Sequence, residues 1–311
     1  MHPLLGTLAS RLVERWLSLL VLPGALFLGV TVAGAALGHA HWYDAERLGA
    51  ELDEFAERPA ADQPGTVVLL VAAVLLLACA ASLAGQFLGG AIERFWLRTA
   101  RDPVSRALVK RRRRRWERQA AAREAARARS EAAARPDESG DDLVIPADAW
   151  AEVVARTAAR DRIALRRPVR PTWYGDRMES AAERVHDAYG IDLAAVWPRL
   201  WLVLAEPGQR QIQSARESFS VAARLAAWAV LYAVLALWWW PSALIAAGCA
   251  VVARARARDA LDALASLTEA AVDVHARELA TQIGLLTADP PEPLGHAAGT
   301  TMSELFRKDT D

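Results

Sequence analysis

Long uncharged stretches constrain this chain more than any other feature of its sequence. Leu17–Leu37 is an uncharged run of 21 residues, and as a helix such a run covers about 31 Å, the thickness of a bilayer's hydrocarbon core. Thr66–Ile92 is a second run without charge, and a third apolar region, Leu225–Ala253, is interrupted by Trp238–Pro241. The interruption indicates two helical legs joined by a turn. We therefore expect an all-α membrane protein with four transmembrane helices, two N-terminal spans and one C-terminal hairpin, and a small helical cytosolic domain.

Two of these spans admit a second interpretation. Arg11 and Arg15 precede the first run, as basic residues precede the core of a signal peptide, but the run is longer than such a core and we interpret it as a retained signal anchor. The hairpin legs correspond to only about 24 Å and 20 Å of helix. The hairpin is therefore either re-entrant or extended by snorkelling of Arg224 and Arg254. Trp residues at the turn favour a full crossing, because indole rings settle at the headgroup level.

Charge asymmetry predicts the orientation. The segment 38–65 carries seven acids and two bases, a net charge of −5, whereas 94–135 carries 15 Lys and Arg against four acids, a net charge of +11. Cytoplasmic loops hold the excess of Lys and Arg, so we expect 38–65 outside and 94–135 inside, with both termini cytoplasmic. Ala and Arg are abundant and Lys occurs only twice, a bias of GC-rich bacterial genomes. The predicted localisation is the bacterial plasma (inner) membrane.

Composition also divides the chain into segments, with room for one modest cytosolic domain. The predicted segments are 1–16 cytosolic N-terminus, 17–37 transmembrane helix, 38–65 acidic external loop, 66–92 transmembrane helix, 93–135 Arg-rich cytosolic helical arm, 136–147 linker, 148–218 small helical cytosolic domain, 219–240 and 241–253 transmembrane helices, 254–288 cytosolic amphipathic helix and 289–311 disordered tail. The arm between 120 and 134 contains no large apolar residue, so we expect a solvated helix without a buried face.

Within the cytosolic domain, Asp176 is a suitable N-cap for a helix over 177–189 that Gly190 ends, and Asp192 can cap the next helix. Asp176, Glu183 and Arg199 could form a polar site, but caps and ion pairs account for such residues more simply. The apolar aromatics Trp173, Trp197 and Trp201 are candidate interaction residues on the cytosolic side.

This region carries a motif composed of Pro171, Thr172, Gly175, Asp176, Ala182, Glu183, Tyr189, Gly190, Asp192, Trp197, Pro198, Arg199 and Leu200. Over about 30 residues plus the hairpin, the chain resembles a family of uncharacterised bacterial multi-pass inner-membrane proteins. The family has a Pro-Thr dipeptide, Gly followed by Asn or Asp, an Ala-Glu pair, Tyr-Gly-x-Asp and Trp-Pro-Arg-Leu before a membrane hairpin. Asp176 stands where Asn is common, and the resemblance implies an inner-membrane location without implying an activity.

Two helical stripes predict packing partners. Beyond Arg254 the residues Leu261, Leu264, Thr268, Val272, His275, Leu279, Ile283 and Leu286 share one helix face, which needs a partner. We expect that partner to be 153–163 or a second copy of the chain, with His275 as a register or pH-sensitive residue or simply a satisfied interface residue. In the first two spans, Ala25, Gly29 and Ala33, and likewise Ala81, Gly85 and Gly89, lie on common faces. Small residues at this spacing permit close helix association, so a homo-oligomer is possible.

Six consecutive bases follow the second span: Lys110, Arg111, Arg112, Arg113, Arg114 and Arg115. Basic clusters beside a span commonly set topology and contact anionic lipids. We therefore predict a lipid-facing basic cluster, with the anionic lipids of the inner leaflet as its partner. Nucleic acid is the less favoured alternative.

Signatures of catalysis or metal binding are missing from the sequence. It contains no G-x-G-x-x-G, P-loop, H-E-x-x-H, G-x-S-x-G or paired C-x-x-C pattern. His39 and His41 lack a third defined ligand, and the spans carry no central acid or base of the kind a transport pathway needs. We expect no enzyme, cofactor or metal. The leading hypothesis is a membrane scaffold or anchor that presents its cytosolic domain to an unknown cytosolic protein. The alternatives are an oligomeric pore or membrane-perturbing effector and a membrane-tethered nucleic-acid-binding protein.

Overall fold

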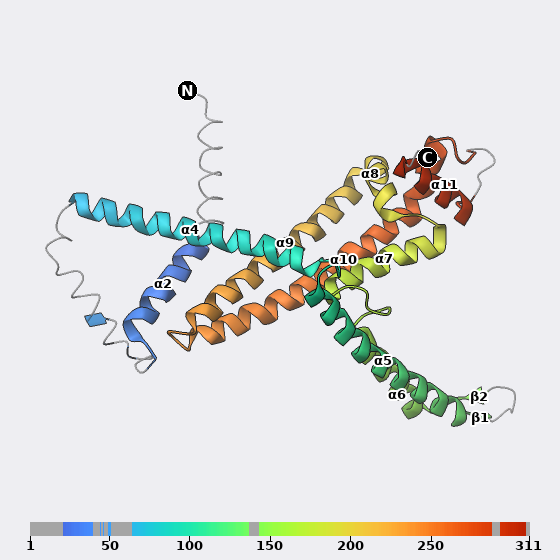
Figure 1. Cartoon of the computed structure of the whole chain (residues 1–311), viewed down its shortest axis with the longest axis horizontal. Helices are drawn as coiled ribbons and strands as arrows, with labels where there is room; N and C mark the ends of the chain where they lie inside the picture. Colours follow the sequence, from blue (N-terminus) through green and yellow to red (C-terminus); the bar gives the residue numbers. More distant parts are fainter. Residues whose placement is uncertain are drawn as a thin grey trace. The chain divides into compact units, whose positions relative to one another are not determined.

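A computed structural model describes residues 21–39, 44, 46, 49, 50, 64–136, 143–287 and 293–308 (Figure 1). Among these residues the fold is all-α except for one pair of two-residue strands, as the sequence predicts. The chain forms two compact units. Unit 1 comprises residues 1–93 and 219–257, and unit 2 comprises residues 94–218 and 258–311. Helices α9 (Glu206–Leu235) and α10 (Ser242–Gln282) each supply residues to both units.

The apolar helices of unit 1 lie where the uncharged runs predict them. Helix α2 (Leu22–Leu37) has a proline in its first turn and ends where Gly38 takes a φ of 61°, a conformation that glycine adopts without steric cost. Helix α4 (Pro64–Trp96) follows. Among the described residues, two helical stretches, Gly65–Trp96 and Glu206–Leu235, are long and apolar enough to cross a membrane, whereas α2 is a shorter apolar helix. Residues 17–20 of the predicted first span lie outside the described part of the chain.

Glycines set the closest helix approaches in unit 1. A Cβ added to Gly24 of α2 would overlap the backbone of α4, and one added to Gly85 of α4 would lie 3.1 Å from the Trp228 ring of α9. Gly89 packs on α9 in the same way, whereas a Cβ at Gly29 would meet nothing within 4 Å. The predicted small-residue face of α4 thus packs within the chain. Helix α2 makes its close approach to α4 through Gly24, and association through the predicted face with Gly29 stays a prediction.

The tryptophan-rich interruption of the third apolar region forms a turn between α9 and α10, as the sequence predicts. The Ser242 hydroxyl group lies 2.8 Å from the Trp239 carbonyl oxygen in the turn and 3.1 Å from the Tyr232 carbonyl oxygen in α9, and it donates its hydrogen bond toward these two acceptors. The Phe27 ring of α2 lies 5.4 Å from the Tyr232 ring and 5.8 Å from the Trp228 ring, centroid to centroid. These aromatic contacts join α2 to the hairpin within unit 1.

In unit 2, α5 (Pro103–Ala132) and α6 (Ala147–Asp161) run side by side toward the strand pair of β1 (Arg135–Pro136) and β2 (Leu143–Val144) (Figure 1). The expectation of a solvated arm is wrong, because α5 packs along α6 and buries Ala126 almost completely. An alanine-rich face buries little area per residue but allows close helix contact. The predicted linker therefore connects two helices that pack against each other.

The core of unit 2 gathers α7 (Trp173–Tyr189), α8 (Leu193–Val203) and α11 (His296–Arg307) with the start of α9 and the second half of α10. Its fully or nearly fully buried apolar residues include Val185, Ile191, Val196, Leu200, Ile212, Val272, Leu279 and Met302. The stripe of α10 thus finds its partner in α7, α8, α9 and α11, and not in 153–163 or a second copy as predicted. His275 lies at the edge of this core, where its Nδ1 is 3.3 Å from a Glu278 carboxylate oxygen.

The described part of the C-terminal tail is ordered, so the prediction of a disordered tail over 289–311 is wrong for 296–307. Helix α11 docks on α7 and α8 with Met302 fully buried. The Ser303 hydroxyl accepts a hydrogen bond from the Asp192 N–H at 2.8 Å, and Arg307 Nε donates to the Asp192 carboxylate at 3.0 Å. A Cβ at Gly299 would overlap the Tyr189 carbonyl oxygen, so only glycine permits this approach.

We expect Gly299→Ala to release α11, because the added methyl group must displace the α7 backbone. Loss of about 1.4 kcal/mol of docking free energy corresponds to a tenfold change in the docking equilibrium. Amide hydrogen exchange over 296–307 should therefore accelerate at least about tenfold. Gly295→Ala is the matched control, since a Cβ there would meet nothing within 4 Å. Equal exchange in the two variants would contradict the close approach.

Candidate functional site

The start of α7 differs from the sequence prediction. The helix begins at Trp173 rather than Arg177, and its N-cap is Thr172, whose hydroxyl oxygen accepts from the Gly175 N–H at 3.1 Å. The same hydroxyl donates to the Trp96 carbonyl, and the Trp96 ring stacks on Tyr174 with centroids 4.5 Å apart. Thr172 competes successfully for the cap because its backbone is extended, as a cap requires.

Asp176 is a buried acceptor, not a cap. One carboxylate oxygen accepts the N–H groups of Val169 and Arg170 at 2.8 Å and 2.7 Å, and the other lies 2.6 Å from an Arg112 nitrogen. Burial raises the pKa of the Asp176 carboxyl, while the two backbone N–H groups and Arg112 oppose part of that rise. The carboxylate thereby holds α5, the extended segment before α7, and α7 together.

Arginines on α7 fix that helix along α10. Arg177, whose side chain is only 7% exposed, places Nε 2.5 Å from an Asp262 carboxylate oxygen and lies 3.5 Å from Glu269. Arg184, two turns further on, also pairs with Glu269. A shared carboxylate between two guanidinium groups is a geometrically demanding arrangement, so α7 and α10 are held in one register.

Helix α8 closes one end of the space between α7 and α9. Its N-cap is Asp192, as predicted, which accepts from the Ala194 N–H at 3.0 Å. The hydrogen bond from Arg307 lowers the pKa of the Asp192 carboxyl below its ordinary value, so this cap stays ionised. Helix α8 runs through Pro198 without a break, and its rings Trp197 and Trp201 lie 6.1 Å apart.

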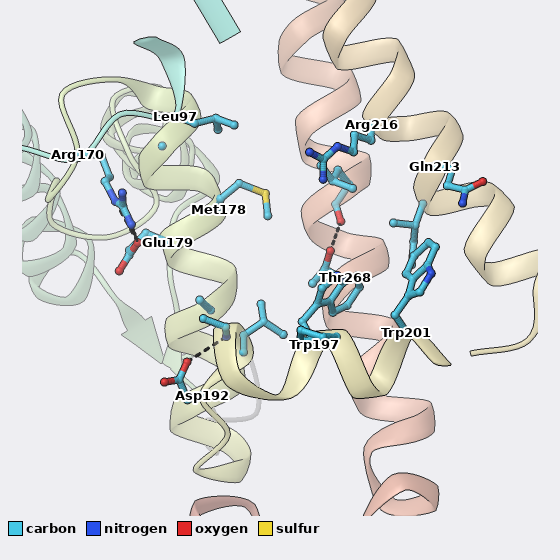
Figure 2. A pocket seen from close by; sticks show the side chains of 17 residues that line it. Leu97, Arg170, Met178, Glu179, Asp192, Trp197, Trp201, Gln213, Arg216 and Thr268 are labelled. Carbon is cyan, nitrogen blue, oxygen red and sulfur yellow. Dashed lines mark hydrogen bonds and ion pairs between the residues drawn. The ribbon is translucent and has the colours of Figure 1, made fainter. Parts of the chain in front are cut away.

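An open cavity of about 820 Å³ lies among α7, α8, α9 and α10 (Figure 2). Its apolar lining includes Leu97, Met178, Ala182, Leu193, Trp197, Trp201, Ile212 and Leu264. Figure 2 shows Trp197 and Trp201 rising from α8, Met178 entering from α7 and Arg216 reaching in from α9. This volume is in the range of pockets that bind small molecules, and a mostly apolar wall with a few polar groups is typical of them.

Most of the polar groups that line the cavity already have partners. Arg170 pairs with Glu179, Asp192 pairs with Arg307, and the Thr268 hydroxyl donates to the Leu264 carbonyl oxygen at 2.8 Å. Arg216 and Gln213, by contrast, form no side-chain hydrogen bond or ion pair with any residue that the structure describes. The cavity therefore offers a guanidinium and an amide to a ligand.

The predicted candidate residues do not form one site. Trp197 and Trp201 line the cavity, but the Trp173 ring lies against the Arg258 guanidinium at 4.8 Å. Glu183 lies 3.5 Å from Arg166. Arg199 donates to the Ala195 carbonyl oxygen at 3.0 Å and covers the Phe306 ring at 4.9 Å. Asp176, Glu183 and Arg199 thus serve separate structural contacts, as their simpler interpretation predicts.

The six-residue basic cluster divides between two faces of α5. Arg112 donates to the Ile163 carbonyl oxygen at 2.7 Å and to Asp176, and Arg113 donates to the Pro168 carbonyl oxygen at 2.7 Å. These two arginines hold the domain together, so the prediction that they face lipid is wrong. The exposed members Lys110, Arg111, Arg114 and Arg115 share a face with Arg118 and Ala107. Because each helical residue turns by about 100°, six consecutive bases must occupy opposite sides.

Sequence reasoning missed Met178, Arg216 and Gln213 as lining residues. Met178 lies within the predicted helix over 177–189, where no feature distinguishes it, and nothing in the sequence predicts that α9 would bring residues 213 and 216 opposite α7. Among the described residues, no group of three His, Cys, Asp or Glu could hold a metal ion. His41, part of the weak external metal hypothesis, lies outside the described residues.

The chain matches no protein-family model, and comparison with curated proteins and with solved structures found no match. The resemblance of its 171–200 segment to bacterial inner-membrane proteins stays a prediction.

We expect Asp176→Ala to lower the stability of unit 2 by about 3–5 kcal/mol, because it leaves a partly buried guanidinium and two backbone N–H groups without their acceptor. Asp176→Asn should cost less, about 1–3 kcal/mol, since an amide oxygen still accepts. The free energy of unfolding of each variant is measured by chemical denaturation, with hydrogen exchange of the α7 amides as the probe. Glu124→Ala, at an exposed position of α5, should stay within about 0.5 kcal/mol. If Asp176→Ala were as stable as this control, Asp176 would not be the acceptor that holds α5 and α7 together.

Proposed function

We propose that the chain is an integral membrane scaffold of the bacterial inner membrane, with four membrane crossings and both termini in the cytoplasm. It holds the helical unit 2 at the inner leaflet and presents it to a cytosolic protein. One observation carries the proposal: the apolar helix α4 is followed, after only six residues, by a helix with a continuous cationic face. Such a sequence of elements suits a chain that leaves the bilayer on its cytoplasmic side.

The surface of α4 supports a lipid environment. Val68, Leu69, Leu76 and Phe87 are each more than two-thirds exposed, whereas the core helix of a water-soluble protein buries such side chains. Contiguous exposed apolar surface on this scale is costly in water and favourable in a bilayer. The remaining crossings that we propose are α2 and the two legs of the hairpin, with Trp238–Trp240 at a membrane surface.

The cationic face of α5 supports contact with anionic lipid. Five bases point away from α6 on one side of the helix: Lys110, Arg111, Arg114, Arg115 and Arg118. Juxtamembrane bases contribute about 1 kcal/mol each beside an anionic leaflet. Arg112 and Arg113 hold the opposite side of α5 against the domain, so lipid contact at this face would orient the domain as well as attach it.

Exposed aromatic and aliphatic side chains support a protein partner. Trp150 and Val154 of α6, one turn apart, are 54% and 51% exposed. Tryptophan is enriched among the residues that dominate protein interfaces, and a pair at this spacing presents one apolar strip on the side of a helix. We propose this strip on α6 as the point of contact. The small-residue face of α4 packs within the chain and so lends no support to a homo-oligomer.

The proposed topology is tested by cysteine labelling in intact cells, after Cys79→Ser and Cys249→Ser remove the native thiols. A membrane-impermeant maleimide should label Glu46→Cys without permeabilisation, because 38–65 is outside. It should label Glu124→Cys only after permeabilisation. If Glu124→Cys were labelled in intact cells, α5 would lie outside the cell, and both the proposed orientation and the scaffold proposal would be wrong.

The lipid contact is tested with a nitroxide at Ala107→Cys, in the same cysteine-free chain reconstituted in nanodiscs. We expect its collisions with a water-soluble relaxation agent to fall when anionic lipid replaces zwitterionic lipid. The difference should vanish at 1 M salt, where the Debye length is about 3 Å. Combined charge reversal at Lys110, Arg111, Arg114 and Arg115 should also abolish it, whereas Arg127→Glu with Arg156→Glu, off this face, should not. If the collision rate of the nitroxide did not depend on lipid charge, the proposed contact between α5 and anionic lipid would be wrong.

A further inference from the structure

We infer that the cavity among α7, α8, α9 and α10 binds a single-chain amphiphile whose head is an anion, a carboxylate or a phosphate. This inference goes beyond the scaffold role, because it gives unit 2 a small-molecule ligand. Neither the membrane crossings nor the cationic face of α5 is part of the site, so the scaffold proposal and this one can fail separately.

The walls of the cavity define the body of the ligand. The rings of Trp197 and Trp201, the Met178 thioether and the side chains of Leu193 and Leu264 present a broad apolar surface. Burial of hydrocarbon against such walls favours the complex, because it removes apolar surface from water. Methionine adapts its shape to irregular partners. A flexible alkyl chain fits such walls better than a rigid polar metabolite does.

The uncommitted polar groups define the head. Arg216 is the one cation lining the cavity without an ion pair among the described residues, since Arg170 is neutralised by Glu179. The Trp197 and Trp201 indole N–H groups likewise have no hydrogen-bond partner there. The two lining carboxylates, Glu179 and Asp192, are already paired with arginines. The site thus has spare hydrogen-bond donors and a spare positive charge.

Guanidinium binds carboxylate and phosphate through two parallel hydrogen bonds, which gives it a preference for planar or multivalent oxygen anions over neutral heads. Figure 2 places Arg216 across the cavity from the α8 rings. An acyl chain lying over Trp197 and Trp201 can therefore direct its head toward Arg216. An acidic peptide helix would match the charge as well, and the experiment separates the two.

The test uses the full chain in zwitterionic nanodiscs and three photoreactive probes with the same diazirine-bearing alkyl chain. Their heads are a carboxylate, a phosphate monoester and a neutral alcohol. We expect crosslinks to Met178 or Trp197 with at least one anionic probe, at least tenfold stronger than with the alcohol. The stronger of the two anionic arms tells whether the natural head resembles a fatty acid or a lysophospholipid.

Arg216→Glu should reduce anionic crosslinking at least tenfold. Its matched control, Arg210→Glu, changes an exposed arginine of the same helix that pairs with Glu206, and should have no effect. Ala182→Trp fills the cavity while it keeps Arg216, and should abolish labelling by all three probes. A hydrogen-exchange profile of α7 like that of the unmodified chain shows that each variant is folded.

Four results would overturn the inference: equal labelling by alcohol and anion, full labelling of Arg216→Glu, full labelling of Ala182→Trp, or crosslinks confined to α4 and the α9–α10 turn. Displacement of the probes by an acidic amphipathic peptide, but not by an excess of unlabelled amphiphile, would replace the small molecule by a protein segment.

Discussion

The Asp176 carboxylate joins the start of α7 to the extended segment just before it and to α5, whose Arg112 is 64 residues earlier in the sequence. It accepts the backbone N–H groups of Val169 and Arg170 and pairs with Arg112 of α5. A carboxylate in this position loses much of its hydration, and only several good hydrogen bonds make its burial acceptable. The start of α7 therefore depends on α5 and on the extended segment before it. The α5–α6 hairpin and the helices around the cavity are thus parts of one unit.

Ion pairs that cross between helices then determine where α7 lies. Arg177 and Arg184 share Glu269 of α10, and Asp192 at the start of α8 holds Arg307 of α11. Each pair links residues more than 80 positions apart in the sequence. Hydrophobic burial supplies most of the driving force for folding, but it does not choose among registers of an alanine-rich helix. The charged pairs supply that choice.

Patterns within single elements were predictable from the sequence, because local chemistry determines them. Uncharged length locates α2 and α4, the Trp-Pro interruption locates the α9–α10 turn, and Gly190 ends α7 with a φ of 68°. Contacts between elements were not predictable. Ala126 carries no sign that α6 will cover it, and Gly299 carries no sign that Tyr189 will approach it. Both residues allow a close approach because their side chains are small or absent, and small residues give no periodic hydrophobic signal in the sequence.

The same limit applies to the cavity. Trp197 and Trp201 are candidates from the sequence alone because large aromatics beside a predicted membrane segment require an explanation, and both line the cavity. Arg216 was indistinguishable from the 36 other Lys and Arg residues of the chain. What distinguishes it is the neutralisation of its neighbours: Arg170, Glu179 and Asp192 are all paired.

A charge acquires a functional meaning only when the charges around it are already compensated, because pairs inside a folded unit cancel each other's field at short range. In unit 2 the interior carboxylates are each matched by an arginine, so the fold itself requires neither Arg216 nor the outward cations of α5. Exposed cations cost a protein little in water, and their presence alone is therefore weak evidence. Their placement is stronger evidence: the α5 cations share one helix face, and Arg216 projects over an apolar cavity. Both positions favour an anion that also carries hydrocarbon, which is the chemistry of an amphiphile.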